Sequence, residues 1–156
     1  MELGAQLDEA AIRRVRGSFE RQGLMRHLGA RMTDLRAGIV TLHLPFRAEL
    51  TQQHGFFHAG GTAAIADSAG GYAGYTLFAD GTEVLTTEFK LNLINPARGD
   101  LLEATGRVIK PGRTLTVCHL DVWAIAGETR IHCATGLQTL ICVRADRADA
   151  APTERG

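Results

Sequence analysis

The sequence predicts an α+β domain in which one antiparallel sheet packs around one long helix. The first observation is composition: from Ala59 to Gly74, twelve of sixteen residues are Ala, Gly or Ser, and none is Pro. The second is order, because alternating apolar and polar runs separated by turn residues follow this segment almost to the end of the chain. A helix with almost no polar face must be covered on nearly all sides, and the strands that follow can cover it.

The first predicted element is an amphipathic helix over about residues 7–22, ended by Gly23 or Gly29. Its apolar residues recur at helical spacing: Leu7, Ala11, Ile12, Val15 and Phe19. A strand follows over residues 39–44, where apolar and polar residues alternate. An Arg-Ala-Gly turn precedes this strand and Pro45 closes it.

After an irregular polar connection over residues 46–57, the long helix is predicted over about residues 58–78. The dipeptide Asp80-Gly81 is a turn signal that stops it. Four further strands are predicted in succession, over residues 83–93, 101–109, 114–124 and 130–143. Phe89 and Trp123 on these strands are expected in the core.

The chain is expected to form one domain over residues 1–145, because 156 residues fit a single domain by size. The tail over residues 146–156 consists mainly of Ala, Asp, Arg and Pro without periodicity and is predicted to be disordered. A formal net charge of zero predicts no affinity for nucleic acid. Without a long apolar run or an apolar N-terminal leader, neither a membrane span nor a signal peptide is expected.

Three widely spaced cysteines, Cys118, Cys133 and Cys142, are predicted to be buried reduced thiols, which places the protein in the cytoplasm. His54 and His58 are four residues apart, as metal ligands on a helix often are. No third ligand accompanies them, so no metal site is predicted.

Asp67 interrupts the small-residue helix, and a buried carboxylate needs a partner, a cleft or a proton. One interpretation is structural: Asp67 accepts hydrogen bonds from strand hydroxyls such as Thr86 or Thr87. The other is chemical. The helix opens with His58-Ala59-Gly60-Gly61 beside a polar loop, and the free N–H groups of a helix start can stabilise a carbonyl oxygen that becomes an oxyanion.

Transfer of an acyl group to water needs at least two groups: N–H donors that polarise the carbonyl, and a carboxylate that attacks it or activates the water. Ala59 and Asp67 are eight residues apart, which is about 12 Å along a helix axis. One carbonyl carbon therefore cannot contact both groups in one chain. If both groups act together, the Asp67 of one subunit must face the helix start of another, across a dimer interface.

The segments TQQHGFFHAGGTAAIADSAGGYA, TTEFKLNLINPA and KPGRTL resemble the hotdog-fold acyl-CoA thioesterases of the phenylacetate-pathway (PaaI) type. The resemblance covers about residues 46–143 and implies a hotdog fold. It implies that Asp67, nine residues after His58, is the acidic catalytic residue. It also implies that the N–H of Ala59, helped by that of Gly60, polarises the carbonyl. Gln52 stands where the family commonly has an Asn that positions the reactants, and Thr86 matches a strand hydroxyl near the water.

The resemblance further implies that Lys110, Gly112, Arg113 and Thr114 contact coenzyme A, with Lys90 a weaker candidate. A glycine turn flanked by cations can bind phosphates, although the sequence alone also fits a solvated hairpin tip. No cofactor is expected beyond the CoA thioester, which is the substrate. The family implies a homo-oligomer, either a dimer or a dimer of dimers (a homotetramer).

The function expected from these residues is hydrolysis of an aryl- or medium-chain acyl-CoA. The pocket would be lined by the small helix residues with Phe56, Phe57 and Tyr72. One alternative is a hotdog enoyl-CoA hydratase or dehydratase that uses His54 or His58 with Asp67. Another is a protein of this fold that binds acyl-CoA without turnover.

Overall fold

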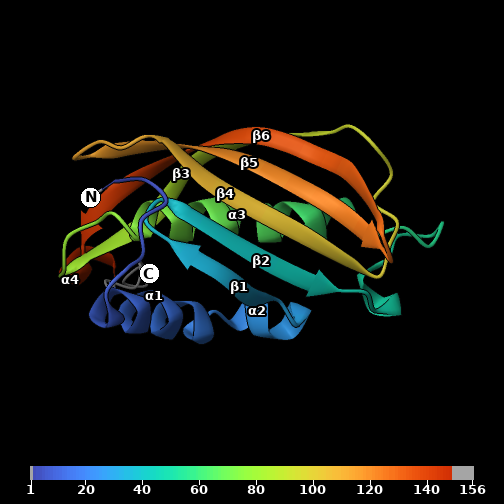
Figure 1. The fold of residues 1–156 in the computed structure, drawn as a ribbon, viewed down its shortest axis with the longest axis horizontal. Helices are drawn as coiled ribbons and strands as arrows, with labels where there is room; N and C mark the ends of the chain where they lie inside the picture. The colour runs from blue at the N-terminus through green and yellow to red at the C-terminus, as the bar shows by residue number, and fades with distance from the viewer. Residues whose placement is uncertain (1, 149–156) are drawn as a thin grey trace, which may run out of the picture.

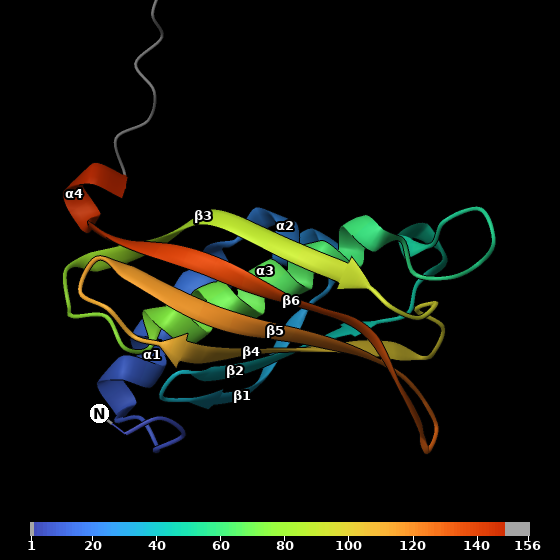
Figure 2. The same cartoon turned by 90° about the horizontal axis from the view of Figure 1, so that it is seen from above.

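The long helix α3 (Ala59–Tyr75) lies in the concave face of one antiparallel sheet in the computed structural model, which describes residues 2–148 (Figures 1 and 2). The expected α+β arrangement is confirmed. The other helical elements are α1 (Glu9–Arg21), α2 (Gly23–Leu28), the 3-10 turn η1 (Ala48–Leu50) and α4 (Ala145–Ala148). The strands are β1 (Arg31–Arg36), β2 (Ile39–Pro45), β3 (Thr82–Leu93), β4 (Leu101–Lys110), β5 (Leu115–Ala126) and β6 (Thr129–Arg144).

The six strands run in the order β1-β2-β4-β5-β6-β3, so β1 and β3 form the two edges. Every neighbouring pair is antiparallel. Each of the central strands β4 and β5 buries alternate residues, and these residues face α3. The sheet therefore curves around the helix, with its outer face left to solvent (Figure 2).

The small residues of α3 allow the helix backbone to touch the sheet. A Cβ atom added at Gly106 on β4 would lie 2.4 Å from the backbone of Ala69 and Gly70, so only glycine fits there. From Ile65 to Tyr75, every helix residue except Asp67 is buried. The expectation of a covered helix is confirmed, and its first turn, at Ala59 and Gly60, is the exposed exception.

Helix α1 covers the side of α3 that faces away from the sheet (Figure 1). The rings of Phe19 and Tyr72 meet edge to face, with their centroids 5.6 Å apart. The guanidinium group of Arg14 donates hydrogen bonds to the carbonyl oxygens of Tyr75, Phe78 and Ala79. These carbonyls lie at and just beyond the C-terminus of α3, where a cation is favoured by the helix dipole.

The structure differs from the predicted elements in four places. The first helix ends at Arg21, and a second short helix follows and ends at Gly29, whose φ of 77° favours glycine. Strand β1 was not predicted, and α3 ends at Tyr75 rather than near residue 78. Residues 146–148, predicted to be disordered, belong to α4; the remainder of that tail lies outside the described residues.

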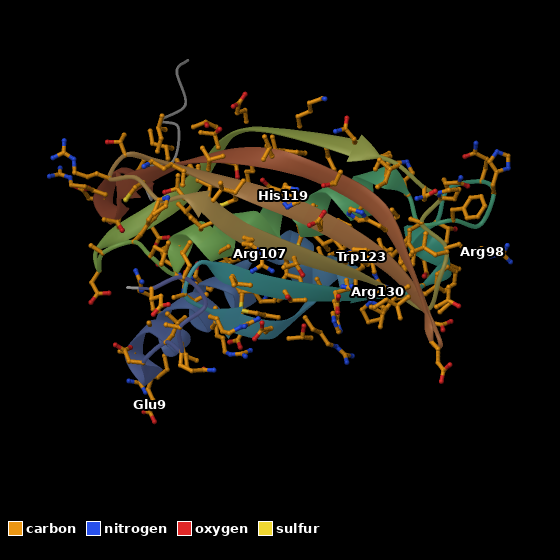
Figure 3. The ribbon with its side chains drawn as sticks, turned by 45° about the horizontal axis from the view of Figure 1, so that its top comes forward. Glu9, Arg98, Arg107, His119, Trp123 and Arg130 are labelled. Carbon is orange, nitrogen blue, oxygen red and sulfur yellow. The ribbon has the colours of Figure 1, made fainter. Side chains whose placement is uncertain are left out.

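The expected burial of Trp123 is also wrong. Its ring lies on the outer face of the sheet, stacked on His132 with centroids 4.3 Å apart and beneath the guanidinium of Arg130 (Figure 3). Cys118 and Cys133 are buried free thiols, as predicted, and Cys142 is half-buried. Burial raises the pKa of Cys118 to about 12 and that of Cys133 to about 11. Over residues 2–148, no helix combines the length and hydropathy that crossing a membrane requires.

Candidate active site

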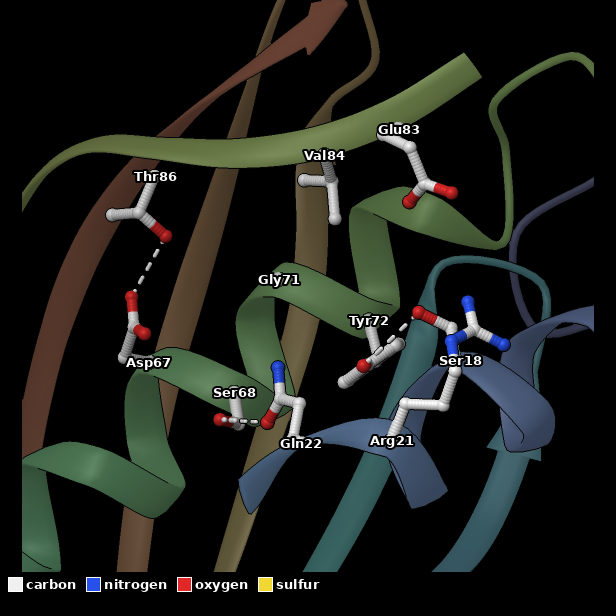
Figure 4. Close-up of a pocket in the computed structure, with 10 residues that line it drawn as sticks. All are labelled: Ser18, Arg21, Gln22, Asp67, Ser68, Gly71, Tyr72, Glu83, Val84 and Thr86. Atoms are coloured by element: carbon white, nitrogen blue, oxygen red, sulfur yellow. Dashed lines mark hydrogen bonds between the residues drawn. The ribbon is translucent and has the colours of Figure 1, made fainter. Parts of the chain in front are cut away.

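Asp67 lies in the middle of α3, half-buried, with its carboxylate directed toward β3. Its Oδ1 atom accepts a hydrogen bond of 2.8 Å from the hydroxyl of Thr86 (Figure 4). The same oxygen accepts a second hydrogen bond, of 2.7 Å, from the side-chain amide of Gln138. Thr86 and Asp67 are thus brought together as predicted, whereas the hydroxyl of Thr87 bonds instead to the carbonyl oxygen of Thr139.

Gln138 was missed by the sequence interpretation. It lies on β6 and is only 1% exposed, and its amide nitrogen also lies 3.0 Å from the Thr86 hydroxyl. A signal was present in the sequence. Gln138 occupies an inward position of a strand whose other inward residues nearby, Ala134 and Leu140, are apolar and buried. A buried polar side chain needs a partner, and here the partner is the carboxylate.

The start of α3 presents one free backbone donor. His58 is the N-cap residue, and its Nδ1 atom accepts a hydrogen bond of 2.8 Å from the N–H of Gly60. The N–H of Gly60 is therefore engaged, and its expected role would require His58 to release it. The N–H of Ala59 has no hydrogen-bond partner within residues 2–148 and is exposed. Ala59 is the better placed of the two for binding a carbonyl oxygen.

The loop before α3 is a closed turn. Phe57 and Thr51 pair across it, and Gly55 at φ 79° donates to the carbonyl oxygen of Gln52. The side-chain oxygen of Gln52 accepts from the backbone N–H of His54. The half-buried Gln52 lines the same hollow as Ala59, and His54 is exposed. Across the described part of the chain, no three His, Cys, Asp or Glu side chains gather where they could hold a metal ion.

Hollows flank both parts of the helix, and Asp67 borders two of them, one beside β3 and one beside α2. The hollow beside Asp67 has a volume of about 290 Å³ and is bounded by α1, α3 and β3 (Figure 4). The hollow beside Ala59 has a volume of about 470 Å³ and includes Gln52. Tyr72 lines the first, whereas Phe56 and Phe57 line the second. Phe56, Phe57 and Tyr72 were expected to line a single pocket, but within one protomer they line two separate hollows.

Edge strand β3 has an apolar face that α3 leaves uncovered. Phe89 pairs with the inward-facing Gln138, and Leu93 pairs with the inward-facing Ala134. Both apolar side chains thus point to the helix side of the sheet, yet Phe89 is 44% and Leu93 57% exposed. The expectation that Phe89 is buried in the core is wrong for the single chain. Phe89 lies on the face of the sheet that is directed toward α3, but α3 does not cover it.

The candidate CoA-binding residues lie apart from this face. Lys110, Gly112, Arg113 and Thr114 occupy the exposed hairpin between β4 and β5, near the C-terminal half of α3. Lys90 pairs with the exposed Leu137 and lies on the outer face of the sheet. Thr86 lies on the inner face, which is the face directed toward α3. Lys90 is therefore not brought together with Asp67 in the protomer.

A family model described as the thioesterase superfamily matches residues 54–131, from the polar loop to the start of β6. The chain belongs to the thioesterase superfamily. A crystal structure of a thioesterase family protein from Silicibacter pomeroyi is 43% identical, covers 86% of this chain and 98% of its own, and has a TM-score of 0.84. The enzyme class expected from the resemblance, a thioester hydrolase, is confirmed.

Two further proteins are similar to this chain. The proofreading thioesterase EntH of Klebsiella pneumoniae is 27% identical over 117 residues, which are 75% of this chain and 85% of that protein. The Escherichia coli PaaI protein from the phenylacetic acid degradation operon is 19% identical. It has a TM-score of 0.76 and covers 85% of this chain and 93% of its own. Its likeness in fold confirms that this thioesterase has the hotdog fold expected from the sequence.

Proposed function

We propose that this thioesterase hydrolyses acyl-CoA thioesters, with Asp67 as the acidic catalytic residue and the N–H of Ala59 as the donor to the thioester carbonyl. The carrying observation is the Asp67 carboxylate, held by Thr86 and Gln138 at the edge of an open hollow. A carboxylate that served only the fold would not need to line a hollow. His58 caps the helix and leaves Ala59 as the free donor.

The active site is shared between two protomers. Asp67 and Ala59 are eight residues apart on one helix, about 12 Å along its axis, so a single thioester carbon cannot contact both within one chain. Strand β3 is an open edge, and the inward-facing Phe89 and Leu93 beside it are exposed. A second copy paired along β3 would cover these residues and bring its own helix start toward Asp67. The assembly is a dimer or a dimer of dimers.

The reaction needs no other reactant than water. In one route Asp67 takes a proton from water as the water oxygen bonds to the thioester carbon. In the other the carboxylate itself bonds to that carbon, and water then cleaves the resulting anhydride. In both routes the carbon–sulfur bond breaks, the CoA thiolate takes up a proton and the free acid leaves. The N–H of Ala59 stabilises the negative charge on the carbonyl oxygen.

The acyl group is an aryl or a medium-chain group. The hollow beside Asp67 lies near the lower limit of ligand pockets, which begin at about 300 Å³. Tyr72 forms part of its wall, and Gly71 leaves open space on the helix face (Figure 4). Coenzyme A lies outside this hollow, and the cations Lys110 and Arg113 of the hairpin between β4 and β5 supply charge for its phosphates. Gln52 lies beside Ala59 and positions the thioester from the partner's side.

The deciding experiment is thiol release from phenylacetyl-, benzoyl-, hexanoyl- and palmitoyl-CoA, by the wild type and by Asp67→Asn. We expect turnover of the smaller acyl groups and a loss of at least about a hundredfold in kcat in the variant, equivalent to ~2.7 kcal/mol of transition-state stabilisation. Asn keeps the shape of the side chain and its bond from Thr86, so circular dichroism and oligomer size should not change.

No turnover of any thioester by a folded wild-type protein would contradict the proposal. Binding without turnover would then indicate an acyl-CoA binder, and hydration of an enoyl-CoA would indicate a hydratase.

A further inference from the structure

The Asp67 carboxylate is anchored through one oxygen only. Oδ1 accepts hydrogen bonds from Thr86, at 2.8 Å, and from Gln138, at 2.7 Å. Oδ2 has no hydrogen-bond partner among the described residues, and it is not among their buried unpartnered polar atoms. Hydrogen bonds to an ionised oxygen are strong. One oxygen is thus fixed, and the other is accessible from the hollow.

The orientation of the Gln138 amide follows from its neighbours. An ionised carboxylate can only accept, so the NH₂ group must point toward Asp67. The amide nitrogen lies within hydrogen-bond distance of three acceptors, which share its two hydrogens: Asp67 Oδ1 at 2.7 Å, and the Thr86 hydroxyl and the Asp67 carbonyl oxygen at 3.0 Å each. The amide links strand β6 to the helix and to strand β3, so Gln138, Thr86 and Asp67 form a closed triangle.

This orientation leaves the other end of the amide without a partner. Oε1 of Gln138 is buried and accepts no hydrogen bond from any residue between 2 and 148. It lies against Gly70, where an added Cβ atom would be 1.9 Å from it. A buried acceptor without a donor destabilises a fold, so the amide is not explained by stability alone. The arrangement is explained if orienting the Asp67 carboxylate contributes more to function than the unpartnered Oε1 costs in stability.

We propose that Gln138 is a positioning residue of the thioesterase reaction. By donating to Oδ1 it fixes the rotamer of Asp67 and directs Oδ2 toward the thioester bound at the protomer interface. Thr86 is the second anchor of the same oxygen. This inference rests on the proposed function, in which Asp67 acts on the thioester, and it holds for both routes of hydrolysis.

The test is Gln138→Met, which keeps the length of the side chain and removes its donors. The steady-state constants are measured with the best acyl-CoA substrate, and the melting temperature is measured in parallel. We expect kcat to fall by about 10- to 100-fold, the effect of losing a hydrogen bond to a charged group. KM should stay within about threefold, and Tm should stay the same or rise, because the unpartnered Oε1 is removed too.

Leu140→Met is the matched control, since Leu140 is the next inward residue of β6 and has no contact with the carboxylate through hydrogen bonds. It changes the packing of the strand and should leave kcat within about threefold. The double variant Gln138→Met/Thr86→Val adds a second readout. Because both residues hold one oxygen, its loss in kcat should differ from the product of the two single losses.

Two sets of results separate failure of this inference from failure of the proposed function. A wild type inert on every thioester refutes the function itself. An active wild type and an inactive Asp67→Asn, with Gln138→Met turning over at the wild-type rate, overturn only the inference. A Gln138→Met protein that does not fold, or whose Tm and kcat fall together, also overturns it, because the amide would then serve the fold.

Discussion

The start and the middle of α3 are built from the same small residues but have opposite surroundings. Around Asp67 the helix is enclosed by the sheet, and Gly106 lets its backbone touch β4. At Ala59 the helix is exposed, and a backbone donor stays free. Small residues serve close packing in one place and access to the backbone in the other. Under the proposed function, the two regions are half-sites, each completed by the half-site of another copy.

The largest expected change in kcat is that of Ala59→Pro, which tests the role of the free N–H at the start of α3. Proline lacks the N–H, yet it is favoured at the first position of a helix, where that group has no intrahelical partner. His58 has φ −66° and ψ 138°, a conformation that a following proline accepts. We expect kcat to fall by roughly 10²- to 10³-fold, as for the loss of one oxyanion donor, with Tm unchanged or higher.

Ala59→Ser is the control, because it keeps the N–H and should retain most of the activity. Wild-type kcat in Ala59→Pro would show that this N–H is not the donor, and Gly60 would then have to leave its bond to His58.

The next largest effect is recovery of activity by mixing two inactive proteins. Asp67→Asn and Ala59→Pro protomers are combined, after dissociation and reassociation, and thiol release is measured. In a mixed dimer one shared site carries both defects and the other carries neither. Random pairing should therefore restore about a quarter of the wild-type sites. If each site were built within one protomer, no intact site could form, and activity would stay at the level of the separate variants.

The positions of the strands after α3 could be predicted because clear turn signals separate them and because two of them, β4 and β5, bury every second residue. Strand β1 could not. It buries only Met32 and Leu35, three residues apart, because a bulge between Met32 and Asp34 breaks the alternation. Spacing of this kind is closer to a helical pattern than to a strand. The edge strand β1 therefore cannot be recognised from its own residues, and only its pairing with β2 defines it.

The site residues divide in the same way. Asp67 and Thr86 could be predicted, one as a carboxylate in a covered helix and the other as a strand hydroxyl. Gln138 depends on the register that places β6 beside β3, and this register is a long-range property. The outward place of Trp123 has the same cause, because its partners Arg130 and His132 lie on the neighbouring strand.

The smallest expected effect concerns the acyl group and the middle of the helix. A Cβ atom at Gly71 would meet nothing within 4 Å, because Gly71 borders the hollow beside Asp67 rather than the sheet. Gly71→Ala should therefore raise the free energy of unfolding by about 0.5–1 kcal/mol, through helix propensity. The added methyl group narrows the hollow. It should lower kcat/KM for phenylacetyl-CoA by roughly 10-fold relative to acetyl-CoA, the lower end of the discrimination produced by one methylene-sized group.

Gly17→Ala supplies the matched control, since Gly17 is in the interior of α1 and an added Cβ atom would meet only the end of the Arg21 side chain, at 3.9 Å. It should stabilise the protein by a similar amount and leave the preference among acyl groups unchanged. Chemical denaturation and competition between the two substrates measure both quantities. If Gly71→Ala lowered kcat/KM equally for both substrates, the acyl group would lie elsewhere. The apolar hollow beside Ala59, lined by Phe56 and Phe57, would then be its place.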